Sequence, residues 1–147
     1  MVFKSEALKD DVIINGSFFC NLAFTINKKD VDFSVIVYQL TPEGTYFHLS
    51  YYIGRASYAI DREHRNLLTP NDITQVSFNN SKLISKKLEK GSRIVVVLNV
   101  NKNNNAQLNY GTGKDVNIES VKDAEIPLKI TFTGKSSISL PVWNFNK

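Results

Sequence analysis

The stretch "DFSVIVYQLTPEGTYFHLSYY", residues 32–52, decides the fold class. Apolar side chains occupy both odd-numbered and even-numbered positions in its first half, which is typical of a central strand covered on both faces. "TPEG" is a turn signal, because Pro42 presets φ at the second turn position and Gly44 tolerates the exit geometry. The stretch therefore predicts two antiparallel strands joined as a hairpin.

A period of two recurs on both sides of this hairpin, in residues 20–26, 73–78, 127–133 and 136–142. In the first of these, the even positions are expected to be buried, and Asn21, Ala23 and Thr25 half-exposed. "RIVVVLNV", residues 93–100, is apolar at both parities, as a second central strand would be.

The sequence contains no strong helix signal. "IESVKDAE", residues 118–125, could form only a helical turn or two before Pro127. Many short strands separated by turns indicate an all-β fold, a β-sandwich with jelly-roll or Greek-key connections; the jelly roll would be similar to galactose-binding domains. We expect residues 1–147 to form one such domain. The long connection 99–115 is expected to be functional or part of an interface.

Composition and charge indicate which classes of partner to expect. The chain has 147 residues, 42% of them hydrophobic, and a formal net charge of +4. Its lysines gather in "SKLISKKLEKGSR", residues 81–93, but Glu89 interrupts them and no aromatic residues are interleaved for base stacking. We therefore expect an edge strand guarded by lysines, and no nucleic-acid partner.

The compartment is indicated by cysteine content and hydropathy. Cys20 is the only cysteine and lies in an apolar run, which predicts a small buried thiol and agrees with a reducing compartment. No run approaches the roughly 18 apolar residues of a membrane span, and the first residues lack the apolar region of a signal peptide. We expect a cytoplasmic protein without membrane contact.

"NYGTGK", residues 109–114, invites comparison with a phosphate-binding loop. That motif needs a glycine five positions before Gly113, where Leu108 stands, and a hydroxyl residue after Lys114, where Asp115 stands. The glycines therefore predict a tight turn between strands, and no nucleotide.

Catalytic and metal-binding patterns are also incomplete. His48 and His64 are the only imidazole bases, and no Gly-x-Ser-x-Gly elbow is present. One cysteine with two separated histidines excludes a zinc finger. Asp30 and Asp32 could face a calcium ion, but the required glycine and bidentate glutamate are missing, so acidic residues at a strand entry are expected instead. We predict no catalytic residue, cofactor or metal in this chain.

"IGRASYAIDREHRNLL", residues 53–68, concentrates charged and aromatic side chains. Arginine and tyrosine are favoured at interface centres. The alternative is an internal network of arginines and aspartates that holds a crossover loop in place. The residues alone leave both open.

The order of several segments resembles a known family. These segments are "SEALKDDVIINGS" (5–17), "DFSVIVYQLTPEGTYFHLSYYIGRASYA" (32–59), "LTPNDITQVSF" (68–78), "KLEKGSRIVVVLNVN" (87–101) and "NYGTGK" (109–114). Their succession resembles the C-terminal jelly-roll domain of the X-Pro dipeptidyl-peptidase and cocaine-esterase-like (CocE/NonD) hydrolases, from about Ser5 to Val142.

The resemblance implies a non-catalytic accessory domain, the C-terminal part of a longer serine hydrolase with dipeptidyl-peptidase or esterase activity. The partner would be the α/β-hydrolase domain of the same chain, which carries the catalytic Ser, Asp and His, and the accessory domain would shape substrate access or assembly. The residues expected at the interdomain surface are Arg55, Tyr58, Asn109, Tyr110, Gly111 and Gly113.

Two alternatives remain. One is a free-standing carbohydrate- or ligand-binding module, with Tyr46, Phe47, Tyr51 and Tyr52 as a sugar platform. The other is an oligomerisation domain, in which apolar strand faces pair between copies to form a homo-oligomer.

Overall fold

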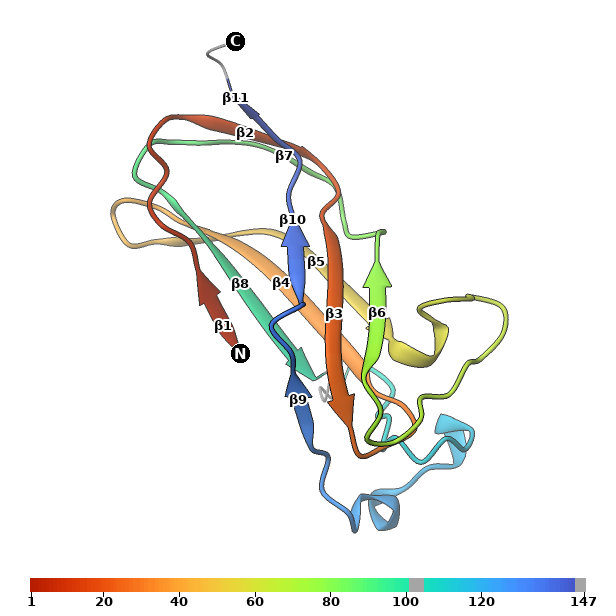
Figure 1. Ribbon diagram of the computed structural model, residues 1–147. Coiled ribbons are helices and arrows are strands. Elements are labelled where there is room, and N and C mark those ends of the chain that lie inside the picture. The colour runs from red at the N-terminus through yellow and green to blue at the C-terminus, as the bar shows by residue number, and fades with distance from the viewer. Residues whose placement is uncertain (101–104, 145–147) are drawn as a thin grey trace.

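Two β-sheets face each other in the computed structural model, which describes residues 1–100 and 105–144, and a third small sheet lies across one end (Figure 1). The strands are β1 Val2–Lys4, β2 Val12–Gly16, β3 Phe19–Ile26, β4 Asp32–Leu40, β5 Tyr46–Arg55, β6 Thr74–Phe78, β7 Ile84–Leu88, β8 Arg93–Val100, β9 Ile130–Phe132, β10 Ser137–Ser139 and β11 Val142–Asn144. Their pairings are antiparallel. The predicted all-β sandwich is confirmed, while the jelly-roll connection stays a prediction.

The first sheet has the strand order β1-β8-β4-β5, so both predicted central strands, β4 and β8, have a neighbour on each side. The predicted hairpin is also confirmed. Thr41 donates its N–H to the Thr45 carbonyl at 2.9 Å, and Gly44 adopts a φ of 88°. That left-handed conformation is available to glycine without steric cost.

A one-residue bulge divides β5 into two halves. Val37 of β4 lies opposite Ser50, and the next residue, Tyr38, lies opposite His48, so Leu49 is an extra residue. An extra residue inverts the alternation of side chains along a strand. Residues 46 and 48 therefore share a face with residues 51 and 53, although their numbers differ in parity.

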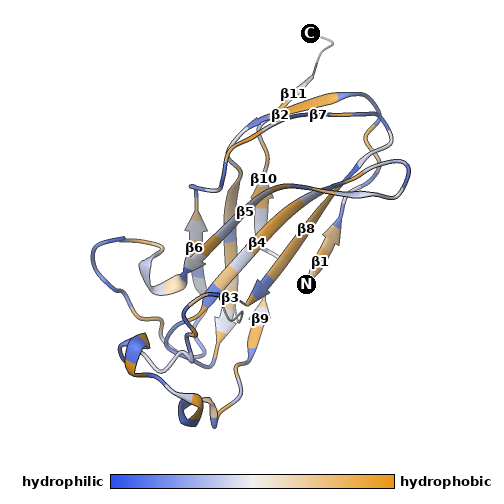
Figure 2. Ribbon diagram, turned by 180° about the vertical axis from the view of Figure 1, so that it is seen from behind, coloured by the Kyte–Doolittle hydropathy of each residue, from blue (hydrophilic) through white to orange (hydrophobic). Residues whose placement is uncertain are grey.

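This shared face points away from the second sheet, because the alternate residues Phe33, Val35 and Val37 lie in the sandwich core. We call it the outer face. It comprises Val2, Lys4, Ser34, Ile36, Tyr38, Leu40, Tyr46, His48, Tyr51, Ile53, Arg93, Val95, Val97 and Asn99. Figure 2 views the sheet from this side, with apolar stretches along β4 and β8 and no other described element in front of them. The prediction that β4 and β8 are covered on both faces is therefore wrong for the outer face, because no further layer of the described residues packs there.

The second sheet is built on β3, which pairs with β6 along one edge and with β9 and then β10 along the other. The predicted alternation holds for β3 with one exception, since Ala23 is buried instead of half-exposed. The turn between β9 and β10 covers it. Thr133 donates its N–H to the Ala23 carbonyl at 2.8 Å, and Ser136 Oγ accepts the Ala23 N–H at 3.0 Å.

The core between the sheets is aromatic and aliphatic. Phe24 and Phe33 meet edge to face with ring centroids 5.1 Å apart, and Phe132 packs 6.2 Å from Phe33. Cys20 lies fully buried in the same cluster, and burial raises the pKa of its thiol to about 12. The predicted buried thiol is confirmed.

The third sheet, β11-β2-β7, closes one end of the sandwich over a small cluster of Val12, Ile14, Ile84 and Leu88. β7 lies at its edge and carries Lys86 and Lys87, as the lysine-guarded edge predicts.

Three short 3₁₀ helices complete the described chain: η1 Ala56–Tyr58, η2 Val116–Ile118 and η3 Val121–Ala124. η3 agrees with the helical turn or two expected within residues 118–125, whereas η2 ends where that range begins. Among residues 1–100 and 105–144, no helix has the length and apolar content to cross a membrane. Residues 101–104 of the predicted 99–115 connection lie outside the described residues.

Candidate functional site

The end of the sandwich opposite the third sheet is organised by two carboxylates at the start of β4. Asp30 is 0% exposed. It accepts hydrogen bonds from the Ser57 N–H at 3.0 Å, the Ser57 hydroxyl at 2.7 Å and Arg65 Nη2 at 2.9 Å, and also from the N–H of Val31. A buried carboxylate is stable only when it is paired and hydrogen-bonded, and Asp30 meets both conditions.

Asp32 is held in a similar way from across the sheet. Arg55 lies directly opposite it in the β4–β5 register and donates from Nε at 2.8 Å and Nη2 at 3.0 Å. Asn109 Nδ2 donates to the same carboxylate at 2.8 Å. The hydrogen bond to Asp32 raises the pKa of Arg55 above its ordinary value. This bidentate geometry fixes the end of β5 and the 109–113 loop to one point.

Arg65 connects the crossover 56–68 to the same loop. Besides Asp30, its guanidinium donates to the carbonyls of Gly113 and Lys114. The internal Arg–Asp network, one of the two alternatives for residues 53–68, is thus present as the pairs Arg55 with Asp32 and Arg65 with Asp30. Asp61 is outside it and pairs with His64.

The glycine-rich loop does bind an anion, which is a side chain of its own chain. Glu119 accepts the N–H of Tyr110 at 2.7 Å and that of Thr112 at 3.0 Å, as well as the Thr112 hydroxyl. Gly111 has a φ of 76°, and a Cβ there would lie 2.6 Å from the Asp30 carbonyl oxygen. Gly111 therefore lets the loop approach the strand entry closely, as a tight turn requires.

The six residues predicted at the interdomain surface come together at this end. Asn109 and Gly111 are buried, whereas Arg55, Tyr58, Tyr110 and Gly113 are half-exposed. Their interdomain role stays a prediction. Asp30, Ser57 and Glu119 also organise the end and were not among the six, because pairing over 35 residues, as between Asp30 and Arg65, leaves no local pattern.

The two histidines lie apart from each other. His64 Nδ1 is 2.9 Å from Asp61 Oδ2 on the surface, and backbone hydrogen bonds, first that of Glu63, lower the pKa of Asp61. His48 lies on the outer face with ring centroids 5.5 Å from Tyr38 and 5.9 Å from Tyr51. In the described part of the chain, no three His, Cys, Asp or Glu side chains gather as metal ligands would.

The prediction of a four-ring sugar platform is wrong, because the rings divide between the two faces of β5. Tyr46 and Tyr51 lie on the outer face, whereas Phe47 and Tyr52 lie on the opposite face, where Phe47 is still 49% exposed. Tyr52 packs on Phe78 with a centroid distance of 4.5 Å, and Lys86 Nζ lies 4.1 Å above the Phe47 ring.

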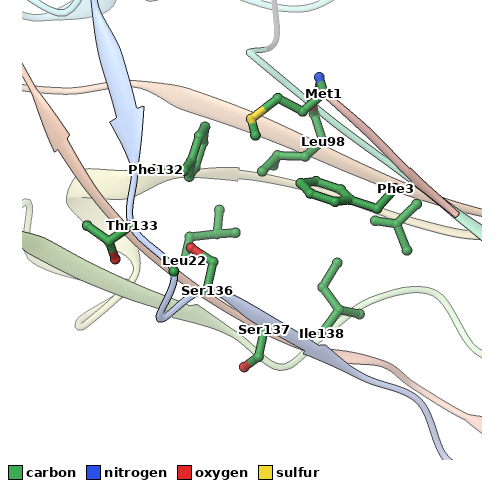
Figure 3. A pocket seen from close by; sticks show the side chains of 11 residues that line it. Met1, Phe3, Leu22, Leu98, Phe132, Thr133, Ser136, Ser137 and Ile138 are labelled. Carbon is green, nitrogen blue, oxygen red and sulfur yellow. Dashed lines mark hydrogen bonds between the residues drawn. The ribbon is translucent and has the colours of Figure 1, made fainter. Parts of the chain in front are cut away.

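A cavity of about 420 Å³ opens where the two large sheets part, between β1 and the β9–β10 turn (Figure 3). Met1, Phe3, Leu98, Phe132 and Ile138 make its walls largely apolar, and Ser136 and Ser137 lie at one side. Its chemistry suits an apolar group better than a sugar.

The fold and this site define an all-β domain whose buried carboxylates are neutralised by its own arginines. Residues 1–125 match the model of the X-Pro dipeptidyl-peptidase C-terminal non-catalytic domain. The chain belongs to that family, as the resemblance in sequence implied. No curated protein sequence matches it.

Solved structures share the fold. An α-amino acid ester hydrolase labelled with selenomethionine superposes with a TM-score of 0.88 at 20% identity, over 97% of this chain and 25% of that one. An aminopeptidase from a marine sediment archaeon, Thaumarchaeota archaeon, gives a TM-score of 0.76 at 20% identity, over 83% and 21%. A CocE/NonD family hydrolase from Staphylococcus aureus gives 0.66 at 17% identity, over 97% and 30%. The chain thus spans less than a third of each of these proteins.

Proposed function

We propose that the chain is the accessory C-terminal domain of a longer serine hydrolase, and that it packs on the α/β-hydrolase domain and shapes substrate access. The family match over residues 1–125 carries this proposal, because that family is defined as C-terminal and non-catalytic. The parent would cleave an ester, amide or X-Pro peptide bond. The names of the neighbours, an ester hydrolase and an aminopeptidase, support this range of substrates.

The end organised by Asp30 and Asp32 has a defined part in the proposal. Arg55 and the 109–113 loop are held rigidly by hydrogen bonds, so Tyr58 and Tyr110 have fixed positions from which to contact a neighbouring domain. Of the six predicted residues, we place Arg55, Tyr58, Tyr110 and Gly113 in the interdomain surface, whereas the buried Asn109 and Gly111 hold the loop beneath it. The parent enzyme is expected to be cytoplasmic.

The complete reading frame tests the proposal first. It should encode a Gly-x-Ser-x-Gly elbow upstream of Met1, followed by an Asp and then a His. The complete polypeptide should hydrolyse p-nitrophenyl esters or X-Pro anilides, and replacing the elbow serine with alanine should abolish this activity. A reading frame without a hydrolase would contradict the proposal.

The 147-residue chain provides the matched control. It should not turn over the same substrates, since the proposal assigns the catalytic serine to the hydrolase domain. Turnover by this chain that is lost in His64→Ala or His48→Ala would show a catalytic function of its own and would overturn the accessory role.

A further inference from the structure

The outer face is an apolar and aromatic surface that the described chain leaves open. Val2 is 68% exposed, Tyr46 60%, Ile53 48% and Tyr51 39%. They lie on the two outermost strands of the sheet, β1 and β5, on either side of the half-buried Ile36, Tyr38 and Val97. Contiguous apolar patches of this kind mark interaction surfaces on soluble proteins.

From this surface, and resting on the proposed function, we propose that the outer face of the β1-β8-β4-β5 sheet is the centre of the interface with the hydrolase domain. The end organised by Asp30 and Asp32 then forms its margin. Arg55 is the last residue of β5 and lies on the same side of the sheet as Tyr51 and Ile53, so the two areas are continuous.

The bulge in β5 supports a docking role. Without the extra residue Leu49, the side chains of Tyr46 and His48 would point into the sandwich, and only Tyr51 and Ile53 would lie outside. The bulge gathers Tyr46, His48 and Tyr51 around Tyr38, with edge-to-face contacts between Tyr38 and both Tyr46 and His48. Bulges often re-aim side chains in this way next to functional sites.

The occupant is argued from chain length and from the position of β1. The solved relatives have about three quarters of their length outside the matching domain, since the chain covers 25% of the ester hydrolase and 30% of the CocE/NonD hydrolase. In a longer polypeptide, the residues before Met1 would reach this domain at β1. β1 is the edge strand of this same sheet, and its Val2 lies on the outer face.

Charge defines the complementary surface. Lys4 and Arg93 are basic residues of the outer face, on the β1 and β8 side. Asp32 at the start of β4 is neutralised by Arg55, and the exposed Glu6 lies 3.9 Å from Arg93 Nη1. The hydrolase domain should therefore present an apolar centre, with an acidic side chain opposite Lys4 of β1.

Hydroxyl-radical footprinting tests the proposal with the complete polypeptide and with the 147-residue chain. Tyr46 and Tyr51 should be oxidised several-fold more slowly in the complete polypeptide. Trp143, which is 65% exposed on β11 of the third sheet, is the internal control and should be oxidised at the same rate in both.

Three outcomes would overturn the inference in different ways. If Tyr46 and Tyr51 stay fully reactive while hydrogen exchange protects the 109–113 loop, the outer face is not the interface, although the accessory function stands. If no part of the domain is protected, both proposals fail. If the isolated chain already shows protection that rises with its concentration, and sedimentation shows a dimer, then a second copy is the occupant.

A pair of variants gives an independent readout. Ile53→Asp places a charge in the outer face, and Ile73→Asp makes the same change at a 73% exposed site before β6. In the complete polypeptide, Ile53→Asp should restore the oxidation of Tyr51, and Ile73→Asp should not. Unchanged melting temperatures of the isolated chains would show that both variants fold, and equal Tyr51 protection in the two variants would contradict the inference.

Discussion

At the scale of single residues, backbone conformation and buried charge decide which positions tolerate change. Gly111 and Gly44 both have positive φ, 76° and 88°, but their surroundings differ. A Cβ on Gly111 would collide with the Asp30 carbonyl oxygen, whereas a Cβ on Gly44 would meet nothing within 4 Å. The pair therefore separates the cost of a left-handed conformation from the cost of close packing.

We expect Gly44→Ala to lower the free energy of unfolding by about 1 kcal/mol, the usual cost of placing a side chain in the left-handed region. Gly111→Ala should lower it by about 3 kcal/mol or more, because the loop must also move away from β4. Urea unfolding of the two variants and the wild type measures both values. Equal losses would mean that the 109–113 loop yields without strain.

Asp30→Asn tests the buried charge. The asparagine would remove the charge that Arg65 neutralises and would turn an NH₂ group toward donors, so we expect a loss of roughly 3 kcal/mol in unfolding free energy. Asp61→Asn is the matched control, since Asp61 forms an exposed pair with His64, and it should change stability little. Similar effects of the two substitutions, measured by thermal unfolding, would argue against the network as a source of stability.

At the scale of elements, local patterns were sufficient for prediction and distant pairings were not. The β4–β5 hairpin, the alternation in β3 and the lysine edge of β7 follow from residues close in sequence. The burial of Ala23 depends on a turn about 110 residues away in the sequence. The ion pair of Asp30 with Arg65 depends on the crossover 56–68, which brings Arg65 back to the start of β4. Sequence spacing carries no signal for such contacts, so the site was only partly predicted, through Arg55 and the glycine loop.

The short helix η3 carries a pH-dependent contact. Asp123 accepts the Ser120 N–H at 2.8 Å and pairs with Lys114 Nζ at 3.0 Å, and these contacts, the first above all, lower its pKa. Its contribution to stability is therefore complete above the ordinary aspartate pKa of about 4 and is lost as the pH falls below that value.

Asp123→Asn should consequently reduce stability more at pH 6 than at pH 2.5, because the contribution of the carboxylate declines below the ordinary aspartate pKa. Urea unfolding at the two pH values measures the difference. An equal effect at both would show that the ionised carboxylate contributes nothing through η3.

At the scale of the whole molecule, one buried thiol reports on the opening of the sandwich. Cys20 lies in the core between the two large sheets, and its pKa of about 12 keeps it protonated at pH 8. Access therefore requires the sheets to separate, so Cys20 should react with a disulfide reagent only at the rate of global unfolding.

Labelling of Cys20 is measured at pH 8 in increasing urea. The labelling rate should rise over the same range of urea concentration as the unfolding transition seen by circular dichroism. Fast labelling without urea would mean that β3 opens locally. A Cys20→Ala variant, which should show no labelling, confirms that the signal comes from this thiol.

The bulge in β5 makes the outer face depend on the number of residues in the strand as well as on their kinds. Loss of Leu49 alone would keep every tyrosine in the chain, yet it would exchange the inward and outward positions of residues 46–48 relative to residues 51–53. During divergence of the family, a single insertion or deletion at this point could therefore convert a docking surface into core and abolish it in one step. A comparison of relatives that scores residue identity without tracking such length changes would miss the difference between a domain that docks through this sheet and one that does not.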